Sequence, residues 1–229
     1  GRMFGKTIFA VSSEELRPAL MGVYMQIVPE EIRMVVTDGH RLPKIINTSF
    51  EAPSVTAKMI VPPKAVQLAL KNIDDEGNTK IVMDNSGICF EFGKTTLYSR
   101  LVEGEYPDYE RVIPRDNDIE LVVNKNLLMA SVKRVSLFSS ALTHQIRFSI
   151  SPGKLAVCSE DVDIGGEAKE ELSVEYQGES MEIGYNAQYV MDILKHIDTD
   201  EVQFLLKSPV RAALISPVKQ NKNESFLML

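Results

Sequence analysis

The stretch "MIVPPKAVQLALKNIDDEGNTKIVMDNSGICFEF", residues 59–92, decides the fold, because residues 181–215, "MEIGYNAQYVMDILKHIDTDEVQFLLKSPVRAALI", repeat its pattern. Each opens with a short apolar strand and continues into a segment with apolar residues at helical spacing. The residues on that helix face are Val66, Ala69, Leu70 and Ile73 in the first copy and Ala187, Val190, Met191 and Leu194 in the second. Both helices end in an acidic turn that contains Ile-Asp, and β-rich segments follow. The chain therefore contains an internal repeat.

A second pair of segments is also similar. Residues 23–38, "VYMQIVPEEIRMVVTD", and residues 146–161, "IRFSISPGKLAVCSED", both predict a hairpin with its turn at Pro29 or Pro152. The stretch ahead of the later hairpin, "IELVVNKNLLMASVKRVSLFSS", predicts a strand and then a helix. Asn124 is the expected N-cap of that helix, and its expected inward residues are Leu128, Val132 and Val135.

We call the repeat unit that contains the hairpin A and the repeat unit that starts at Met59 or Met181 B. The chain thus has the order A–B–A–B, which predicts an α+β fold. Each unit is a strand, a helix and three strands, with two units per domain. The linker "VIPRDND" separates two domains, which we expect at residues 1–115 and 116–229. The first A unit has room only for the tail of its helix, and the chain ends in mid-strand at "NESFLML". We expect a chain shortened at both ends; the alternative is a naturally shorter copy of the unit.

Composition excludes several classes of protein. With 229 residues and 44% hydrophobic content, the chain can bury a core and is not disordered. A net charge of −7 argues against a general basic surface for nucleic acid, although a local basic face remains open. No signal pattern or long apolar run occurs, so we expect a soluble, cytoplasmic protein. Cys89 and Cys158 have no metal-ligand spacing, so we expect two small buried residues, no disulfide, no metal and no cofactor.

The sequence "TDGHRL", residues 37–42, follows the first hairpin, whereas "EDVDIGGEAKEEL" follows the equivalent hairpin of the repeat. The fold unit therefore does not require these residues. Asp38 and His40 could form the acid–base pair of a hydrolase, but no activated nucleophile or metal cluster accompanies them. In a docking surface, Gly39 would shape the turn, His40 and Arg41 would give polar contacts, and Leu42 would form an apolar floor. A solvated turn without a specific role is the third alternative.

Three motifs together resemble a known family. They are "TDGHRL", "SRLVEGEYPDYERVIP" at residues 99–114, and "MEIGYNAQYVMDIL" at residues 181–194. In this order and spacing they are similar to the bacterial DNA polymerase III beta subunit, the replicative sliding clamp. The resemblance covers essentially the whole chain. It implies the DNA-clamp fold, which has three similar domains, and this sequence resembles the second and third of them.

The resemblance also implies a function. Two full-length subunits of this family close head to tail into a ring around duplex DNA, without sequence specificity. The ring is a non-catalytic subunit of the polymerase holoenzyme in the bacterial cytoplasm, at the nucleoid. It tethers the replicative polymerase, the clamp loader, other polymerases and repair proteins through a pocket for a linear peptide motif. We do not expect the present chain to close a ring by itself, and a partner-binding domain that never encircles DNA stays an alternative.

The site residues are carried over by matching motif positions. The resemblance implies a peptide pocket formed by Arg17, Leu20, Thr37, Gly39, His40, Arg41, Leu42, Pro107, Arg111, Val112, Asn186, Tyr189 and Leu229. The expected DNA-facing residues are Lys64, Lys71, Lys125, Lys133 and Arg134. No catalytic residue and no metal ligand is implied. Tyr106 and Tyr109, which flank Pro107, are interpreted as structural.

Overall fold

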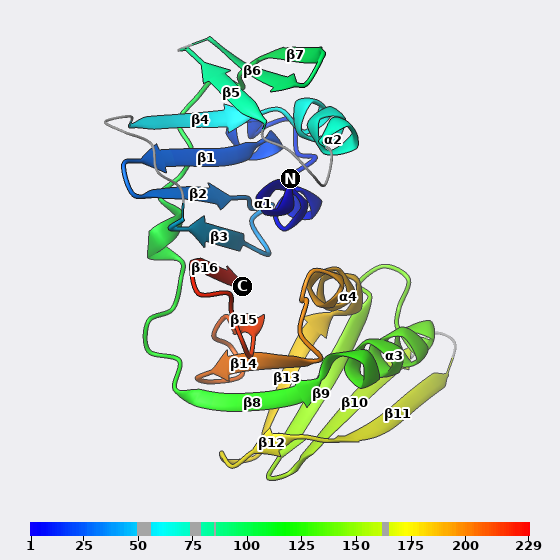
Figure 1. Ribbon diagram of the computed structural model, residues 1–229. Coiled ribbons are helices and arrows are strands. Elements are labelled where there is room, and N and C mark those ends of the chain that lie inside the picture. Colours follow the sequence, from blue (N-terminus) through cyan, green and yellow to red (C-terminus); the bar gives the residue numbers. More distant parts are fainter. Residues whose placement is uncertain (50–55, 74–78, 85, 162–164) are drawn as a thin grey trace. The chain divides into compact units, whose positions relative to one another are not determined.

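The computed structural model describes residues 1–49, 56–73, 79–84, 86–161 and 165–229 (Figure 1). Its contacts divide the chain into two compact units. Unit 1 contains Gly1–Tyr109 and Asn221–Phe226, and unit 2 contains Glu110–Gln220 and Leu227–Leu229. The domain limits 1–115 and 116–229 remain a prediction.

Unit 1 begins with short helices and then forms two antiparallel sheets. The helices are α1 (Arg2–Gly5), η1 (Ile8–Ala10), η2 (Pro18–Met21), α2 (Pro63–Asn72) and, at the boundary with unit 2, η3 (Tyr109–Arg111). The strands are β1 (Val23–Val28), β2 (Glu31–Val35), β3 (Pro43–Asn47), β4 (Ala57–Val61), β5 (Lys80–Met83), β6 (Gly87–Phe92) and β7 (Thr95–Arg100). The strand orders are β3-β2-β1-β4 and β5-β6-β7.

Unit 2 contains both repeat units, each with a strand followed by a helix and further strands. Its helices are α3 (Lys125–Val135), η4 (Ser136–Phe138) and α4 (Ala187–Lys195). Its strands are β8 (Ile119–Asn124), β9 (Gln145–Ser151), β10 (Lys154–Asp161), β11 (Gly166–Ser173), β12 (Glu175–Tyr176), β13 (Met181–Asn186), β14 (Glu201–Leu206) and β15 (Leu214–Pro217). The orders are β11-β10-β9-β13 and β12-β8-β14-β15. The last strand, β16 (Glu224–Met228), has its first residues grouped with unit 1 and its end with unit 2.

The observed elements confirm the predicted repeat. In both units the two strands of the hairpin lie in the middle of a run of four neighbouring strands, and the third strand of the repeat unit lies at one end of this run. The strand that opens the next repeat unit lies at the other end. That opening strand is β4 beside β1 in unit 1 and β13 beside β9 in unit 2. The hairpin turns follow Val28 and Ser151, as predicted. Asn124 caps α3, since its side-chain oxygen accepts a hydrogen bond of 3.0 Å from the backbone N–H of Leu127.

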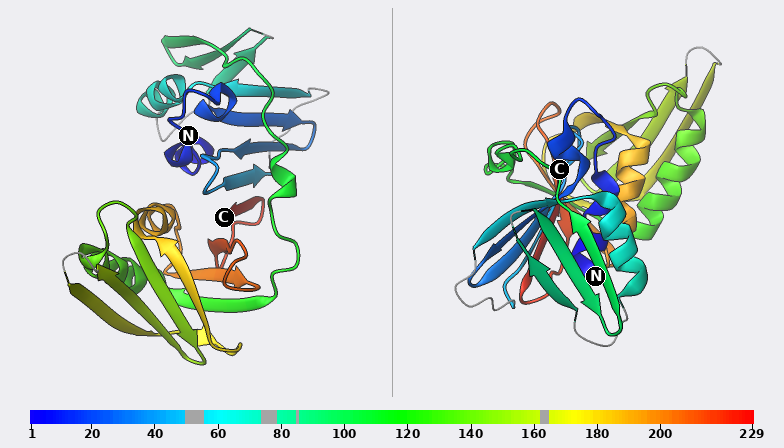
Figure 2. Two further views of the ribbon diagram at one scale, coloured as in Figure 1. Left: turned by 180° about the vertical axis from the view of Figure 1, so that it is seen from behind. Right: turned by 90° about the horizontal axis from the view of Figure 1, so that it is seen from above.

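The core of unit 2 includes the layer between its helices and one sheet. Helices α3 and α4 lie next to each other and cover one face of the β11-β10-β9-β13 sheet (Figures 1 and 2). Phe148 and Leu128 are fully buried at this interface, as are Val132 and Leu194. Each large apolar side chain buried in this way contributes about 1.5–3 kcal/mol to folding.

The predicted inward residues Leu70 and Met191 are only half-buried, and the acidic turn at residues 74–78 lies outside the described residues.

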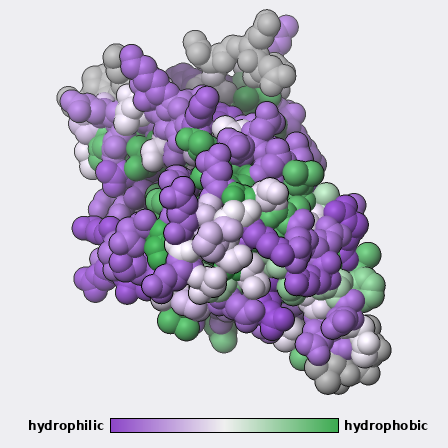
Figure 3. All heavy atoms as spheres, turned by 90° about the horizontal axis from the view of Figure 1, so that it is seen from below, coloured by the Kyte–Doolittle hydropathy of each residue, from purple (hydrophilic) through white to green (hydrophobic). Residues whose placement is uncertain are grey.

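The surface is mainly polar. Hydrophilic residues cover most of the face shown in Figure 3, and apolar residues form small groups among them. Cys89 and Cys158 are free and half-buried, which corrects the prediction that they are buried. Cys158 is partly exposed because it pairs across the sheet with Arg147 and Lys169, which are both exposed on the neighbouring strands. Within the described residues, no helix is long and apolar enough to cross a membrane, and no metal-binding group of acidic, His or Cys residues occurs.

Candidate functional site

Residues 36–42 form a loop that bonds to itself. The strand pairs of β2 and β3 end at Val35 and Lys44, and the N–H of Val36 still donates a hydrogen bond of 3.2 Å to Pro43, so residues 37–42 leave the sheet. The hydroxyl of Thr37 accepts a hydrogen bond of 3.0 Å from the N–H of Gly39. The Asp38 carboxylate accepts bonds of 2.9 and 3.0 Å from the N–H groups of His40 and Arg41. Such side-chain acceptors replace the missing ladder partners, so the loop has a defined shape.

Gly39 is the point at which this loop requires glycine. Its φ angle is +92°, a conformation that costs residues with a Cβ atom about 1 kcal/mol or more. The loop sequence Thr-Asp-Gly therefore provides two acceptors and one permissive backbone position in consecutive residues.

Arg41 fastens the loop to the rest of unit 1. Its Nε donates a hydrogen bond of 3.0 Å to Asp38, and a terminal nitrogen donates one of 3.2 Å to the carbonyl oxygen of Phe9. The guanidinium carbon also lies 5.4 Å from the centre of the Phe9 ring, within range of a cation–π contact. Only 12% of the Arg41 side chain is exposed. Arg41 therefore supports the loop from inside, whereas the sequence suggested an outward polar contact.

The outward surface of the loop belongs to Gly39 and His40, with Arg17 beside them. All three residues are exposed. A terminal nitrogen of Arg17 lies 3.7 Å from the position that a Cβ atom on Gly39 would occupy, and 60% of the Arg17 side chain is exposed. Leu20 and Leu42, at 5% and 3% exposure, lie in the core beneath. The surface thus combines a cation, an imidazole and a bare stretch of backbone on a rigid base.

The same contacts argue against the hydrolase alternative. The Asp38 carboxylate is occupied by two backbone N–H groups and the Arg41 guanidinium. A general base needs a free lone pair directed at the proton that it removes. Asp38 therefore has the geometry of a structural residue that holds the turn.

The remaining predicted pocket residues lie elsewhere in the chain. Pro107 is exposed in unit 1. Arg111 and Val112 are exposed at the start of unit 2, and Leu229 is half-buried at its end. Asn186 caps α4 by accepting hydrogen bonds from the N–H groups of Gln188 and Tyr189, at 2.9 and 3.3 Å. The structure thus brings Arg17 together with residues 37–42 and places a second group of predicted residues in unit 2.

The five predicted DNA-facing residues divide into two groups. The side chains of Lys64 and Lys71 on α2, and of Lys133 on α3, are exposed. Lys125 instead donates a hydrogen bond of 3.0 Å to the carbonyl oxygen of Ile197. Arg134 makes two hydrogen bonds of 2.6 Å to Glu170, which lower the pKa of that carboxyl. Lys125 and Arg134 therefore already have partners within unit 2.

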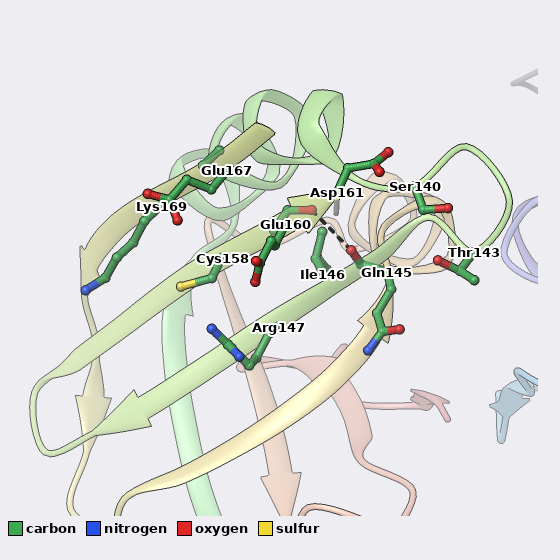
Figure 4. Close-up of a pocket in the computed structure, with 12 residues that line it drawn as sticks. Ser140, Thr143, Gln145, Ile146, Arg147, Cys158, Glu160, Asp161, Glu167 and Lys169 are labelled. Atoms are coloured by element: carbon green, nitrogen blue, oxygen red, sulfur yellow. Dashed lines mark hydrogen bonds between the residues drawn. The ribbon is translucent and has the colours of Figure 1, made fainter. Parts of the chain in front are cut away.

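Unit 2 also contains a cavity of about 580 Å³ that the sequence did not indicate (Figure 4). Strands β9, β10 and β11 and the loop before β9 line it with polar groups. Its charged side chains have both signs: Arg147 and Lys169 line it together with Glu160, Asp161 and Glu167. None of the predicted pocket or DNA-facing residues lines this cavity.

Comparison with known proteins assigns the chain to a family. Residues 1–108 match the central domain of the DNA polymerase III beta subunit, and residues 110–229 match its C-terminal domain. The chain belongs to the DNA polymerase III beta subunit family. This membership confirms the resemblance and the clamp fold that it implied.

The relatives agree with this family over almost the whole chain. The beta sliding clamp of Chlamydia muridarum is 35% identical over 93% of this chain and 58% of its own length. A solved Pseudomonas aeruginosa sliding clamp is 31% identical, covers 100% of this chain and 62% of its own, and has a TM-score of 0.93. A Bartonella birtlesii clamp bound to griselimycin is 35% identical, with coverage of 100% and 62% and a TM-score of 0.89. The chain thus spans about six tenths of the length of the relatives that it matches.

Proposed function

We propose that the chain is the peptide-binding part of a beta sliding clamp, a processivity factor for DNA replication. In the complete protein, two subunits would form a ring around duplex DNA and hold a polymerase at the primer end. Tethering raises the effective concentration of the polymerase there, so the clamp itself needs no catalytic residue. Because bacterial sliding clamps act in DNA replication, we place this one in the cytoplasm.

The main support for the proposal is the exposed surface that Gly39 and His40 form on the self-bonded loop, with Arg17 beside them. Sites that recognise a short peptide need groups that are fixed before the ligand arrives, because ordering them during binding costs affinity. The two acceptor side chains and the half-buried Arg41 fix this surface. The griselimycin bound to related clamps supports a small-ligand site in this family.

The exposed groups indicate which peptide chemistry would bind. Arg17 and Arg111 would pair with acidic, polar or C-terminal groups of a partner, since a guanidinium binds carboxylates through two parallel hydrogen bonds. Val112, 59% exposed, would contact an apolar anchor. For Asn186, Tyr189 and Leu229 in unit 2, the family resemblance supports a role in peptide binding. The proposed partners are the replicative polymerase, the clamp loader, other polymerases and repair proteins that carry a clamp-binding motif.

Duplex DNA is the second proposed partner. The exposed ammonium groups of Lys64, Lys71 and Lys133 would make weak phosphate contacts, which break and re-form as a ring slides. Because the ring would hold DNA topologically, a net charge of −7 is compatible with this role. Lys125 and Arg134 would contribute less, since both already have protein partners.

The test is the affinity of a fluorescent peptide that carries the clamp-binding motif of a replicative polymerase, measured by polarisation. Arg17→Ala and His40→Ala should each weaken binding at least about tenfold, as expected for central contacts of a small site. Both side chains are exposed, so neither change disturbs the core. Lys94→Ala, in the exposed turn between β6 and β7, is the matched control and should leave binding unchanged. Wild-type affinity in both site variants, or no binding by the unchanged chain, would contradict the proposal.

A further inference from the structure

Two tyrosines in unit 1 form a stacked pair across distant parts of the chain. Tyr24 lies on β1, and Tyr106 lies in the segment between β7 and η3. Their rings are parallel within 1°, with centroids 4.5 Å apart. Tyr109 meets the Tyr24 ring edge-on, with centroids 6.2 Å apart. Aromatic pairs in such geometries are more favourable than their buried area alone accounts for, so this cluster fixes the segment to the sheet.

Tyr109 provides the second attachment. Its hydroxyl donates a hydrogen bond of 2.6 Å to the side-chain oxygen of Gln26 on β1. The ammonium group of Lys44 lies 5.5 Å from its ring centre, and the residue is 6% exposed. The residues between the two tyrosines, Pro107 and Asp108, are exposed. Anchoring both tyrosines therefore presents Pro107 at the surface.

The hydroxyl of Tyr106 is buried and has no hydrogen-bond partner within the described residues. Burial raises the pKa of this phenol well above its usual value, and its neighbours include the backbone N–H of Thr37 and the carboxylate of Asp38. The Thr37 N–H opposes the rise in pKa but does not reach full hydrogen-bond geometry. Tyr106 thus lies against the start of the self-bonded loop. Its ring stacks on Tyr24, and its hydroxyl lies near the backbone N–H of Thr37.

We propose that Tyr106 is a positioning residue of the peptide site, which holds residues 37–42 and Pro107 in a fixed relation through its stack on Tyr24. The inference rests on the proposed function of this surface. The loop keeps its internal shape through Thr37 and Asp38, but those bonds do not determine where it lies relative to Pro107. A binding site loses affinity when its parts shift by about 1 Å, so a ring that braces both parts controls binding without contacting the ligand.

The experiment measures the griselimycin affinity of the 229-residue chain at a temperature where every variant is folded. Tyr106→Leu should weaken binding about tenfold, because it removes the stack. Tyr106→Phe keeps the ring and should stay within about twofold of the unchanged chain. Tyr24→Leu should match Tyr106→Leu, and the double variant should be no weaker than either, since both remove the same brace. Tyr98→Leu, at an exposed tyrosine of β7, should have no effect.

Amide hydrogen exchange gives a readout that does not depend on ligand. Tyr106→Leu should speed exchange at Gly39 and His40, whose N–H groups donate to Thr37 and Asp38 within the loop. If Tyr106→Leu does not fold, Tyr24→Leu carries the same test. Unchanged affinity and unchanged exchange in a folded variant would overturn the positioning role. Failure of the unchanged chain to bind griselimycin would instead count against the proposed function, and exchange would still decide the role of Tyr106.

Discussion

The equivalent hairpins of the two units end differently. In unit 2 the ladder between β10 and β11 continues to the last pair, Asp161 with Gly166. In unit 1 the strand pairs of β2 and β3 end at Val35 with Lys44, Val36 still donates a hydrogen bond to Pro43, and residues 37–42 leave the sheet. Both sheets otherwise have the same order, with an opening strand beside the hairpin. The fold therefore does not require the loop, whose exposed residues Gly39 and His40 belong to the proposed peptide site.

The difference also shows how a loop can leave a sheet without losing its shape. Backbone groups released from a ladder must find other partners, because an unpaired buried group costs about 1–3 kcal/mol. In unit 1 the side chains of Thr37 and Asp38 supply those partners. The following predictions test whether this self-bonded loop, rather than the hairpin in general, provides the site.

The largest effect is expected for Asp38→Ala. It removes the carboxylate that accepts hydrogen bonds from two backbone N–H groups and from the half-buried Arg41, so the unfolding free energy should fall by about 2–3 kcal/mol. Griselimycin affinity should fall by about a hundredfold or more, since both loop shape and Arg41 are lost. Calorimetry and a titration measure the two quantities.

Asp84→Ala is the matched control for that change. Asp84 also accepts two backbone hydrogen bonds of 2.7 Å, from Ser86 and Gly87, in a turn outside the proposed site. These bonds lower the pKa of Asp84. Its loss should reduce stability without changing affinity. Equal losses of affinity in both variants would mean that turns in general, and not this loop, control binding.

Alkaline pH should weaken both units through buried tyrosines. Burial raises the pKa of Tyr106 in unit 1 and of Tyr185 in unit 2. Above about pH 10 the unfolded chain releases these protons and the folded chain retains them, so stability is lost as pH rises, by up to about 1.4 kcal/mol per pH unit and proton. Tyr106→Phe and Tyr185→Phe should each remove part of this slope in denaturant titrations at pH 9–11. An unchanged slope in both variants would contradict the burial.

A smaller effect is expected for the glycines of the two hairpin ends. Gly39 has a φ angle of +92° and Gly165 one of +65°. Alanine at either position should reduce stability by about 1 kcal/mol, because a Cβ atom disfavours this conformation. Only Gly39→Ala should also weaken griselimycin binding, measured by titration. A loss of binding in Gly165→Ala would contradict the proposal, because it would place the site at the hairpin end of unit 2.

The smallest effect is expected at acidic pH. Surface partners lower the pKa values of Asp118, Glu170 and Glu171 in unit 2. Below about pH 4 the unfolded chain binds more protons than the folded chain, so stability falls as these carboxylates are protonated. The loss should be slight and should shrink in high salt, since exposed pairs are screened. Melting temperatures at pH 3–5 with and without salt measure it, and a gain in stability on acidification would contradict it.

The sequence predicted the features that depend on neighbouring residues. Helical spacing, the turns at Pro29 and Pro152 and the cap at Asn124 are local patterns, and the structure confirms them. The repeat also singled out residues 37–42 as additional to the fold. Their assignment to a peptide pocket came from the family resemblance and stays a prediction.

What the sequence could not reveal depends on contacts between distant residues. Arg41 bonds to Phe9, 32 positions away, which makes it a support for the loop. Tyr106 stacks on Tyr24, which gives a residue interpreted as structural a proposed role in the site. The cavity beside Arg147 arises from three strands and a loop. No periodicity or motif encodes such pairings, because each is set by how the sheets and segments pack.

The most direct test is a titration of the ¹⁵N-labelled chain with griselimycin, followed by NMR. We expect the amide signals of Arg17, Gly39, His40 and the other residues of the loop at 36–42 to shift more than those of the equivalent hairpin end. The signals of the equivalent hairpin end in unit 2, around Gly165, should stay in place. Shifts around Gly165 with none at residues 36–42 would contradict the claim that the self-bonded loop forms the site.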